Sequence, residues 1–267
     1  MFDFDAALAK RYGGFASYPS AANPLHIEYY GESPAAEMDR LLDRYSTPER
    51  TVLDIGCGAG FTLCRLASTV KAIWGLDQAA DLLQAARLRV EQLGLTNATL
   101  VHGSSYDGEV LKSLPHATFD LAFSRRGPDL SVDLLRTLRK DATFVQELVS
   151  DQDGYSLLEV FGRRNNPPLY ADHQIKLHTY TGFGLLPVSY KEYFYEEFYR
   201  DSEHLEALFL QVPPMLSPWW IRQKQNQRPY DPSRDRPALD LYARYNTTPK
   251  GIRVLRQRKI LVLRRSA

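Results

Sequence analysis

Residues 51–60 read TVLDIGCGAG, and this stretch decides the fold. Its first half is a strand-like apolar run that contains Asp54, and its second half places glycines at positions 56, 58 and 60. Glycine weakens regular elements, so three glycines within five residues predict a backbone that bends sharply or approaches a ligand closely. We therefore expect a strand, a tight turn and then a helix that begins near residue 61.

Short apolar runs alternate with helical patterns around this turn. Ser33 and Pro34 predict the N-cap and the first residue of a helix that ends near Ser46. Short strands separated by helices are typical of a parallel sheet with both faces covered, and we expect this organisation over residues 33–150. The expected strands are residues 51–55, 71–76, 98–101, 119–123 and 143–149, and the expected helices between them are residues 61–68, 79–92 and 132–139.

The chain is less regular outside this part. Residues 188–199 predict a long strand and residues 259–263 a final one. Between them, residues 212–237 contain six prolines, and because proline lacks a backbone donor we expect neither a continuous helix nor a central strand there. We interpret this segment as an insertion or a lid. Residues 1–32 contain glycine and proline breakers and are expected to be irregular.

Composition excludes several classes of protein. The formal net charge is +1, so no overall field attracts nucleic acid or an anionic membrane, and no apolar run approaches the length of a membrane span. The N-terminus carries acids where a secretory signal has basic residues, and Cys57 and Cys64 offer no disulfide framework. No cluster of His, Cys and acidic residues has metal-ligand spacing. We expect a cytoplasmic protein without a metal.

Two acids indicate the ligand of the glycine turn. Asp77 ends the second strand about 20 residues after the first glycine, which is the place of an acid that receives ribose hydroxyls. The spacing of the glycines does not fit the G-x-G-x-x-G of dinucleotide-binding turns. Asp54 precedes the turn, where it would repel a pyrophosphate and attract a cation. The pattern predicts an adenosine cofactor with a positive charge and disfavours a nicotinamide oxidoreductase.

Residues 54–60 match every defined position of D/E-x-G-x-G-x-G, the first motif of class I S-adenosylmethionine-dependent methyltransferases. The chain resembles this family as far as about residue 150, and its last strand is consistent with the family's reversed seventh strand. The resemblance implies an α/β fold with a mostly parallel seven-stranded Rossmann-like sheet flanked by helices, and a C-terminal inserted or lid region. It also implies S-adenosyl-L-methionine as the cofactor and S-adenosyl-L-homocysteine as the product. We expect one domain with an N-terminal cap segment and first helix (1–50), a cofactor-binding core (51–150), and the rest of the sheet with a substrate-side insertion (151–267).

The resemblance further implies which residues contact the cofactor. The glycine turn would lie under the methionine portion, and Asp77 would hold the ribose hydroxyls. Many relatives have an acid near the adenine amino group after the third strand. Here Ser104 or Ser105 would substitute for it, or Asp107 would reach in. The expected cofactor-binding residues are Asp54, Gly56, Cys57, Gly58, Gly60, Phe61, Asp77, Gln78, Ser104, Ser105, Tyr106, Ser124 and Arg125.

Candidates for the acceptor side come from three segments. One of the adjacent residues Arg125 and Arg126 would face a substrate carboxylate or phosphate, and helix capping or surface charge is the alternative. Tyr29 and Tyr30 precede the first helix, where relatives cover the cofactor with an N-terminal segment, and a hydrophobic staple for that helix is the alternative. Glu147 lies in the fifth strand. We expect Arg126, Tyr30 and Glu147 as catalytic residues, and Tyr29, Tyr30 and Arg126 as substrate-binding residues.

The expected reaction transfers a methyl group by direct displacement to an N, O or C atom of a small organic acceptor. Alignment matters more than a general base in such a reaction. The tyrosine-rich residues 180–199 and the segment 212–237 would shape the acceptor pocket. An RNA methyltransferase is one alternative, because residues 250–265 hold seven basic residues and no acid, although solvated faces of edge strands explain them adequately. A non-catalytic S-adenosylmethionine-binding protein is another. We expect a small-molecule partner rather than RNA, no membrane, and a monomer or homodimer.

Overall fold

The computed structural model describes residues 25–150, 152–161, 172–211 and 230–266 of the chain. One mixed sheet organises them, with the strand order β4-β3-β2-β5-β6-β9-β7-β1. The first five strands in this order are parallel, and β9 then runs antiparallel to both of its neighbours. The fold class expected from the sequence is confirmed. The strands of this path are β1 (His26–Tyr29), β2 (Thr51–Ile55), β3 (Ala72–Asp77), β4 (Ala98–His102), β5 (Phe119–Arg125), β6 (Leu138–Val149), β7 (Leu185–Tyr199) and β9 (Gly251–Arg265).

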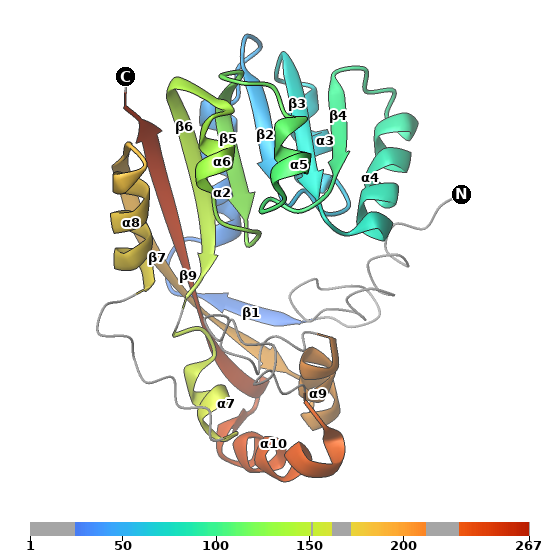
Figure 1. Ribbon diagram of the computed structural model, residues 1–267. Coiled ribbons are helices and arrows are strands. Elements are labelled where there is room, and N and C mark those ends of the chain that lie inside the picture. The colour runs from blue at the N-terminus through green and yellow to red at the C-terminus, as the bar shows by residue number, and fades with distance from the viewer. Residues whose placement is uncertain (1–24, 151, 162–171, 212–229, 267) are drawn as a thin grey trace.

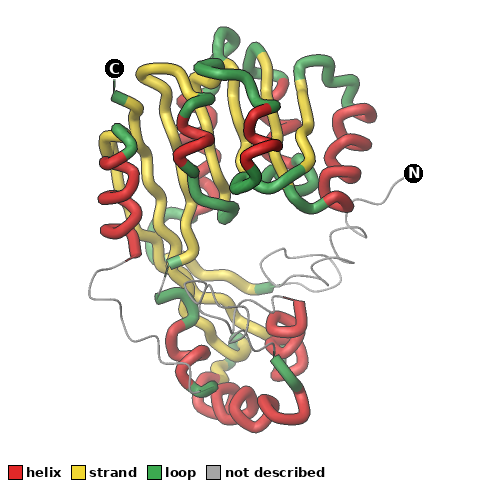
Figure 2. Tube along the Cα trace, in the orientation of Figure 1, coloured by secondary structure: helices red, strands yellow, loops and turns green. Residues whose placement is uncertain are grey.

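Helices cover both faces of the parallel part, as Figure 2 shows. One face carries α2 (Pro34–Tyr45), α3 (Phe61–Ala67) and α4 (Ala80–Gln92). Successive residues of a strand point to opposite faces of the sheet and so belong to two different cores. Val52, for example, packs on this face, while Leu53 packs on the other. This period of two places apolar side chains in both layers of a doubly covered sheet. The opposite face carries α5 (Gly108–Lys112), α6 (Val132–Leu135) and α8 (Asp172–Gly182).

A second lobe extends beyond the carboxyl ends of the parallel strands (Figure 1). It is formed by the parts of β7 and β9 that extend past the last β6 pair, by the strand β1, and by three helices. A separate apolar core holds it together, in which Tyr199 and Val254 from the sheet pack with Leu205, Phe209 and Tyr242 from the helices. The glycine turn follows β2, so the turn and the lobe lie at the same edge of the parallel strands (Figure 1). Its helices are α7 (Tyr155–Glu159), α9 (Ser202–Gln211) and α10 (Pro232–Asn246).

The sheet contains two more strands than expected. β1 lies in the segment that was expected to be irregular and pairs antiparallel with the end of β7, and β8 (Thr247–Thr248) adds a two-residue pair to β9. The prediction for residues 1–32 is thus wrong at residues 26–29, while residues 1–24 lie outside the described parts. The helix expected at residues 132–139 ends early because β6 begins at Leu138.

The proline-rich segment also differs from expectation. Residues 212–229 lie outside the described parts, but residues 232–237 begin α10. Pro232 lies in the first turn, where backbone N–H groups have no helical acceptor, so proline costs no hydrogen bond there. Asp231 caps the helix by accepting the Ser233 N–H. Pro237 lies in the second turn, inside the helix, where its missing N–H costs one helical hydrogen bond that the helix tolerates. The expectation of no continuous helix over 212–237 is therefore corrected at residues 232–237, which begin α10.

Candidate active site at the carboxyl edge of the sheet

The glycine turn has the backbone conformation that the sequence predicts. Gly56, Gly58 and Gly60 all have positive φ, at 81°, 54° and 76°. A side chain at Gly56 would place its Cβ 2.8 Å from Cδ of Pro128, so glycine is required for close packing there. At Gly58 the nearest heavy atom would be 3.9 Å away, which leaves the backbone of the turn accessible to a ligand.

Asp77 fastens this turn to the end of β3. Its Oδ2 accepts the N–H of Gly58 at 2.8 Å, and its Oδ1 accepts the N–H of Ala79 at 2.8 Å. The carboxylate therefore orders the turn and the start of α4 together. Each carboxylate oxygen has further acceptor capacity, so the same group retains lone pairs for the hydroxyls of a bound ribose.

Asp54 is the second acid of the site and is 3% exposed. Burial raises the pKa of its carboxyl well above the ordinary value, the negative charge of Asp77 adds to this effect, and Arg125 opposes it. A positively charged ligand beside Asp54 would relieve this penalty, whereas a diphosphate would increase it. Together with the open backbone at Gly58, this electrostatic arrangement fits S-adenosylmethionine, which carries a cationic sulfonium and a cationic amine.

The other expected cofactor residues have different surroundings. Burial raises the pKa of the Cys57 thiol well above its usual value, so the thiol is held neutral and fills space. The guanidinium of Arg89 lies 3.7 Å from the ring centre of Phe61. Ser124 is fully buried and donates its hydroxyl to the Pro128 carbonyl at 2.7 Å, inside the next turn.

The segment after β4 has no acid in the place where relatives carry one. Ser104 accepts the backbone N–H of Tyr106 at 3.2 Å, and the Tyr106 side chain is exposed. Ser105 is buried, and its carbonyl accepts the Ser131 hydroxyl. Asp107 accepts the Glu109 N–H as the N-cap of α5. Gln78 is exposed at the end of β3, and its carbonyl lies 3.2 Å from the ring of His102.

Arg125, Arg126 and Glu147 meet at the carboxyl ends of β5 and β6. Glu147 is buried, and its two carboxylate oxygens lie 3.4 Å from Nε of Arg125 and 3.7 Å from Nε of Arg126. Arg125 also pairs with Asp39 of α2 at 2.9 Å. Both arginine side chains are at least three-quarters buried, so surface charge does not account for them. The sequence had no signal for Asp39, which lies 86 residues from its partner.

Tyr29 and Tyr30 lie in the second lobe, away from this cluster. The ring of Tyr29 lies 5.5 Å from that of Tyr195, and the N–H of Tyr30 donates to the Phe194 carbonyl at 3.0 Å. Strand β1 is separated from β6, which carries Glu147, by β7 and β9. Arg126 and Glu147 are therefore brought together, whereas Tyr30 is not. Strand pairing, rather than a staple on the first helix, positions both tyrosines.

The basic stretch 250–265 is not an edge strand. It forms β9, which lies between β6 and β7 over Arg258–Arg264 and between β7 and β8 at Ile252. Arg256 and Arg258 are buried, and both pair with Asp153, at 3.1 Å and 2.5 Å. Arg256 also lies 3.1 Å from Glu197. The interpretation of these residues as solvated faces of an edge strand is wrong, and the charges of Arg256 and Arg258 are matched inside the protein rather than presented to RNA.

Metal ligation and membrane crossing find no support in the described residues. Within these parts of the chain, no group of three or more His, Cys, Asp or Glu side chains is arranged to hold a metal ion. Among the helices of the same parts, none combines the length and the apolar character that crossing a membrane requires.

Comparison with known proteins finds similarity to methyltransferases over part of the chain. The pattern of a family described as a methyltransferase domain matches residues 46–163. A protein-L-isoaspartate O-methyltransferase of Saccharophagus degradans is 27% identical over 157 residues, which are 58% of this chain and 66% of that protein. Another of that name, from Halorhodospira halophila, is 32% identical over 132 residues, covering 49% of this chain and 57% of the relative. The chain thus matches less than two thirds of the length of these relatives.

Structural similarity extends further along the chain. The structure of a candidate methyltransferase from Bacillus halodurans C-125 aligns with a TM-score of 0.57 over 87% of this chain and 100% of that one, at 14% identity. Such low identity supports the fold alone. The methyltransferase-domain pattern includes the glycine turn and Asp77, and the strand order and buried acid agree with it. Residues 46–163 thus match a methyltransferase domain, and the fold around them is that of class I S-adenosylmethionine-dependent methyltransferases, whose cofactor suits the glycine turn and the buried acid.

Proposed function

We propose that this protein transfers a methyl group to an N, O or C atom of a small organic acceptor that binds between the glycine turn and the second lobe. The contact between the turn and the segment after β5 carries this proposal. A Cβ on Gly127 would lie 2.8 Å from the carbonyl oxygen of Ile55, so Arg126 and its neighbours pack directly against the turn. This contact supports an acceptor position beside the arginine cluster and next to the cofactor.

The chemistry requires little of the protein beyond alignment. When bound, S-adenosylmethionine supplies a methyl group on a cationic sulfonium, so that an acceptor lone pair forms the new bond to carbon while the electrons of the broken carbon–sulfur bond remain on sulfur and give neutral S-adenosylhomocysteine. We assign Asp54 and the glycine turn to cofactor binding, and Arg126 to orienting an oxygen or anionic group of the acceptor. Glu147 positions both arginines. Alignment of this kind contributes up to about 7–11 kcal/mol of barrier lowering.

Methylation of a protein carboxylate is the second candidate function. The names of the matched relatives favour it, since both are protein-L-isoaspartate O-methyltransferases. An arginine beside the glycine turn suits a carboxylate acceptor in a peptide as well as in a small molecule. Their similarity covers at most 58% of this chain, so their activity is a candidate for this chain and not a finding.

The test combines binding and turnover on the full chain. Calorimetric titration with S-adenosylmethionine, S-adenosylhomocysteine and NAD should show binding of the first two and none of NAD. Transfer of a labelled methyl group is then measured to a small-metabolite extract, to an isoaspartyl peptide and to total tRNA. Label in the small-metabolite fraction supports the proposal. Label only in the peptide supports the second candidate, label only in tRNA supports an RNA methyltransferase, and tight binding without any turnover supports a non-catalytic binding protein.

A further inference from the structure

The turn after β5, residues 126–129, carries Arg126 at its start. The φ of Arg126 is +56°, a conformation that residues with a side chain rarely adopt. The middle of this turn lies against the glycine turn, because a Cβ on Gly56 would be 2.8 Å from Cδ of Pro128. A shift of residues 126–129 would therefore move Arg126 relative to the cofactor. The position of Arg126 depends on what holds the two ends of the turn.

Two neighbouring residues of β6 hold these ends. At the start of the turn, the carbonyl of Glu147 accepts the Arg126 N–H at 3.0 Å. At its end, Nε2 of Gln146 donates to Oδ1 of Asp129 at 2.8 Å. Gln146 and Glu147 are adjacent in the strand, so their side chains point to opposite faces of the sheet. One strand thus fixes the turn with a backbone group at one end and a side chain at the other.

The orientation of the Gln146 amide is set from α8. Gln146 is fully buried, and its Oε1 accepts the Tyr180 hydroxyl at 2.7 Å. Burial raises the pKa of the Tyr180 hydroxyl above its usual value, so this group keeps its proton and is the donor. A rotated amide would place Oε1 against the Asp129 carboxylate, where like charges repel. The amide therefore presents its N–H to the end of the turn.

The same helix also contacts the turn directly. Lys176, whose side chain is 12% exposed, donates to the Asp129 oxygen that accepts from Gln146. The Leu130 N–H donates to the Tyr180 oxygen at 3.4 Å. Hydrogen bonds to an ionised group are stronger than neutral ones, so the carboxylate of Asp129 fixes this end of the turn more firmly than a neutral acceptor would.

We propose that Gln146 and Asp129 are positioning residues for Arg126, and that their hydrogen bond holds the turn on β6 and keeps Arg126 beside the cofactor. Neither residue needs to touch the acceptor. The inference rests on the proposed role of Arg126 in orienting the acceptor. When the hydrogen bond is lost, the end of the turn moves away from β6, Arg126 leaves its left-handed conformation, and a smaller fraction of bound acceptor is aligned for transfer.

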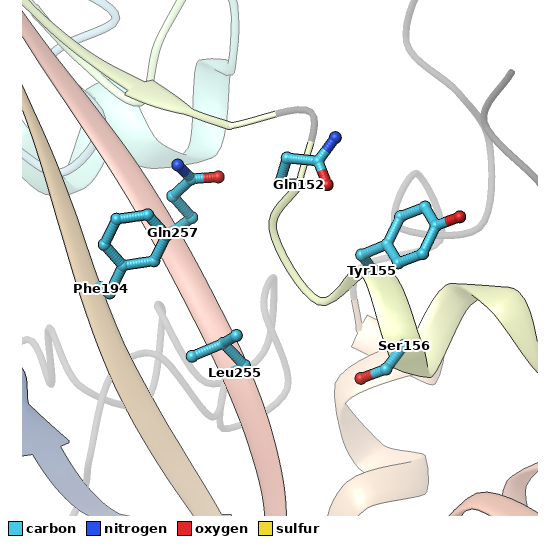
Figure 3. Close-up of a pocket in the computed structure, with 6 residues that line it drawn as sticks. All are labelled: Gln152, Tyr155, Ser156, Phe194, Leu255 and Gln257. Atoms are coloured by element: carbon cyan, nitrogen blue, oxygen red, sulfur yellow. The ribbon is translucent and has the colours of Figure 1, made fainter. Parts of the chain in front are cut away.

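The chain offers a matched pair of substitutions for the test. Gln146→Met keeps the size of the side chain and removes the donor to Asp129. Gln257→Met is the control, because Gln257 is also buried and also bridges a hydroxyl and a carboxylate: its Oε1 accepts from Ser150 at 2.6 Å, and its Nε2 donates to Glu192 at 3.0 Å. Figure 3 shows Gln257 on β9, in the second lobe, opposite the segment that leads into α7.

Amide hydrogen exchange of the full chain, followed by mass spectrometry, reports on the turn without any acceptor. In Gln146→Met, peptides that contain residues 126–131 should exchange faster by at least about tenfold, whereas Gln257→Met should leave them unchanged. Asp129→Ala removes the same hydrogen bond at a side chain that is 37% exposed, where the fold tolerates the change, and should act in the same direction. Asp129→Asn keeps an oxygen acceptor and should stay within about threefold of the unmodified protein. Unchanged exchange in both Gln146→Met and Asp129→Ala overturns the inference.

Steady-state kinetics with the acceptor found in the metabolite fraction tests the link to Arg126. We expect kcat/KM to fall at least about tenfold in Gln146→Met and to be unchanged in Gln257→Met. In the Arg126→Gly background, Gln146→Met should cause no further loss, because a residue that acts through Arg126 then has nothing to position. An unchanged kcat/KM in Gln146→Met, or a further loss of equal size in that background, overturns the inference and leaves the proposed function standing. If no small molecule is methylated, the proposed function fails, and the exchange measurement by itself decides whether Gln146 and Asp129 fix the turn.

Discussion

Arg126 and Glu147 are joined through both backbone and side chain. The N–H of Arg126 donates to the Glu147 carbonyl at 3.0 Å, and Nε of Arg126 lies 3.7 Å from Oε1 of Glu147. The φ of Arg126 is +56°, a left-handed conformation that costs a residue with a side chain roughly 1–2 kcal/mol. A charged residue is thus held in an unfavourable conformation at the edge where the cofactor and the acceptor would meet, which is where such conformations serve function.

Replacing Arg126 tests this assignment. In Arg126→Gly we expect kcat/KM to fall by a factor on the order of 100, because the group that orients the acceptor is lost. The free energy of unfolding should change by no more than about 1 kcal/mol, since relief of the left-handed conformation offsets a weak ion pair. Steady-state kinetics and denaturant unfolding measure the two quantities. Asp141→Gly is the control, because Asp141 is exposed with φ +61° and should gain stability without losing activity.

The Asp54→Asn variant should separate stability from cofactor binding. The folded-state pKa of Asp54 is raised, so its contribution to stability is complete below the ordinary value of 3.8 and is lost as pH rises through the raised pKa. Without cofactor, the variant should therefore melt at a higher temperature than the unmodified protein above that raised pKa. The expected gain in the free energy of unfolding is about 1.4 kcal/mol for each pKa unit by which folding raises the pKa of Asp54. Thermal unfolding across pH measures this difference.

The same variant should bind S-adenosylmethionine more weakly. Because the cationic cofactor favours the ionised Asp54, binding to the unmodified protein should release protons and tighten with rising pH, and both effects should disappear in Asp54→Asn. Calorimetry in buffers of different ionisation enthalpy reports the proton release. Neutral S-adenosylhomocysteine should be affected less. Equal losses of affinity for both ligands would show that Asp54 does not respond to the charge on sulfur.

Asp77 should contribute to both the turn and the cofactor site. Asp77→Ala removes two backbone–carboxylate hydrogen bonds, so we expect the free energy of unfolding to fall by about 2–3 kcal/mol and S-adenosylmethionine affinity to fall at least tenfold. Asp77→Asn keeps one oxygen acceptor and should lie between. Asp231→Ala removes a similar backbone contact at the start of α10 and should weaken folding without altering affinity. An unchanged affinity in Asp77→Ala would exclude the proposed ribose contact.

RNA affinity should be weak and nearly independent of salt. A basic surface that neutralises several phosphates gives an observed binding constant that falls by about 0.7 log units per log unit of salt for each phosphate of a single strand. Arg256 and Arg258 are buried in ion pairs, and Arg253 lies 3.4 Å from Glu196. Fluorescence anisotropy with a labelled single-stranded RNA at low and at high salt measures the slope. A slope that corresponds to several phosphates would restore RNA as a substrate.

The sequence by itself determined the cofactor half of this protein. The strand, the glycine turn and the helix at residues 51–67 are contiguous, so their conformation follows from local propensity and from the φ values that only glycine tolerates easily. The position of Asp77 can be predicted from the sequence as well, because Asp77 ends a short apolar strand and so lies at the same edge of the sheet as the turn. The parallel pairing of these strands then follows from their alternation with helices.

Only the tertiary structure decided the arginine cluster and the second lobe. Asp39 meets Arg125 across 86 residues, and Gln257 meets Ser150 across 107, and neither pair has a local sequence signal. The alternation of charged and apolar residues in β9 is typical of a half-solvated edge strand, but the strand is central because β6 and β7 both pair with it. Strand pairing over long separations is decided by the burial that the whole sheet achieves. Beyond the last β6 pair, at Arg258, the segment that leads into α7 covers β9 instead, and its Asp153 pairs with Arg256 inside the protein.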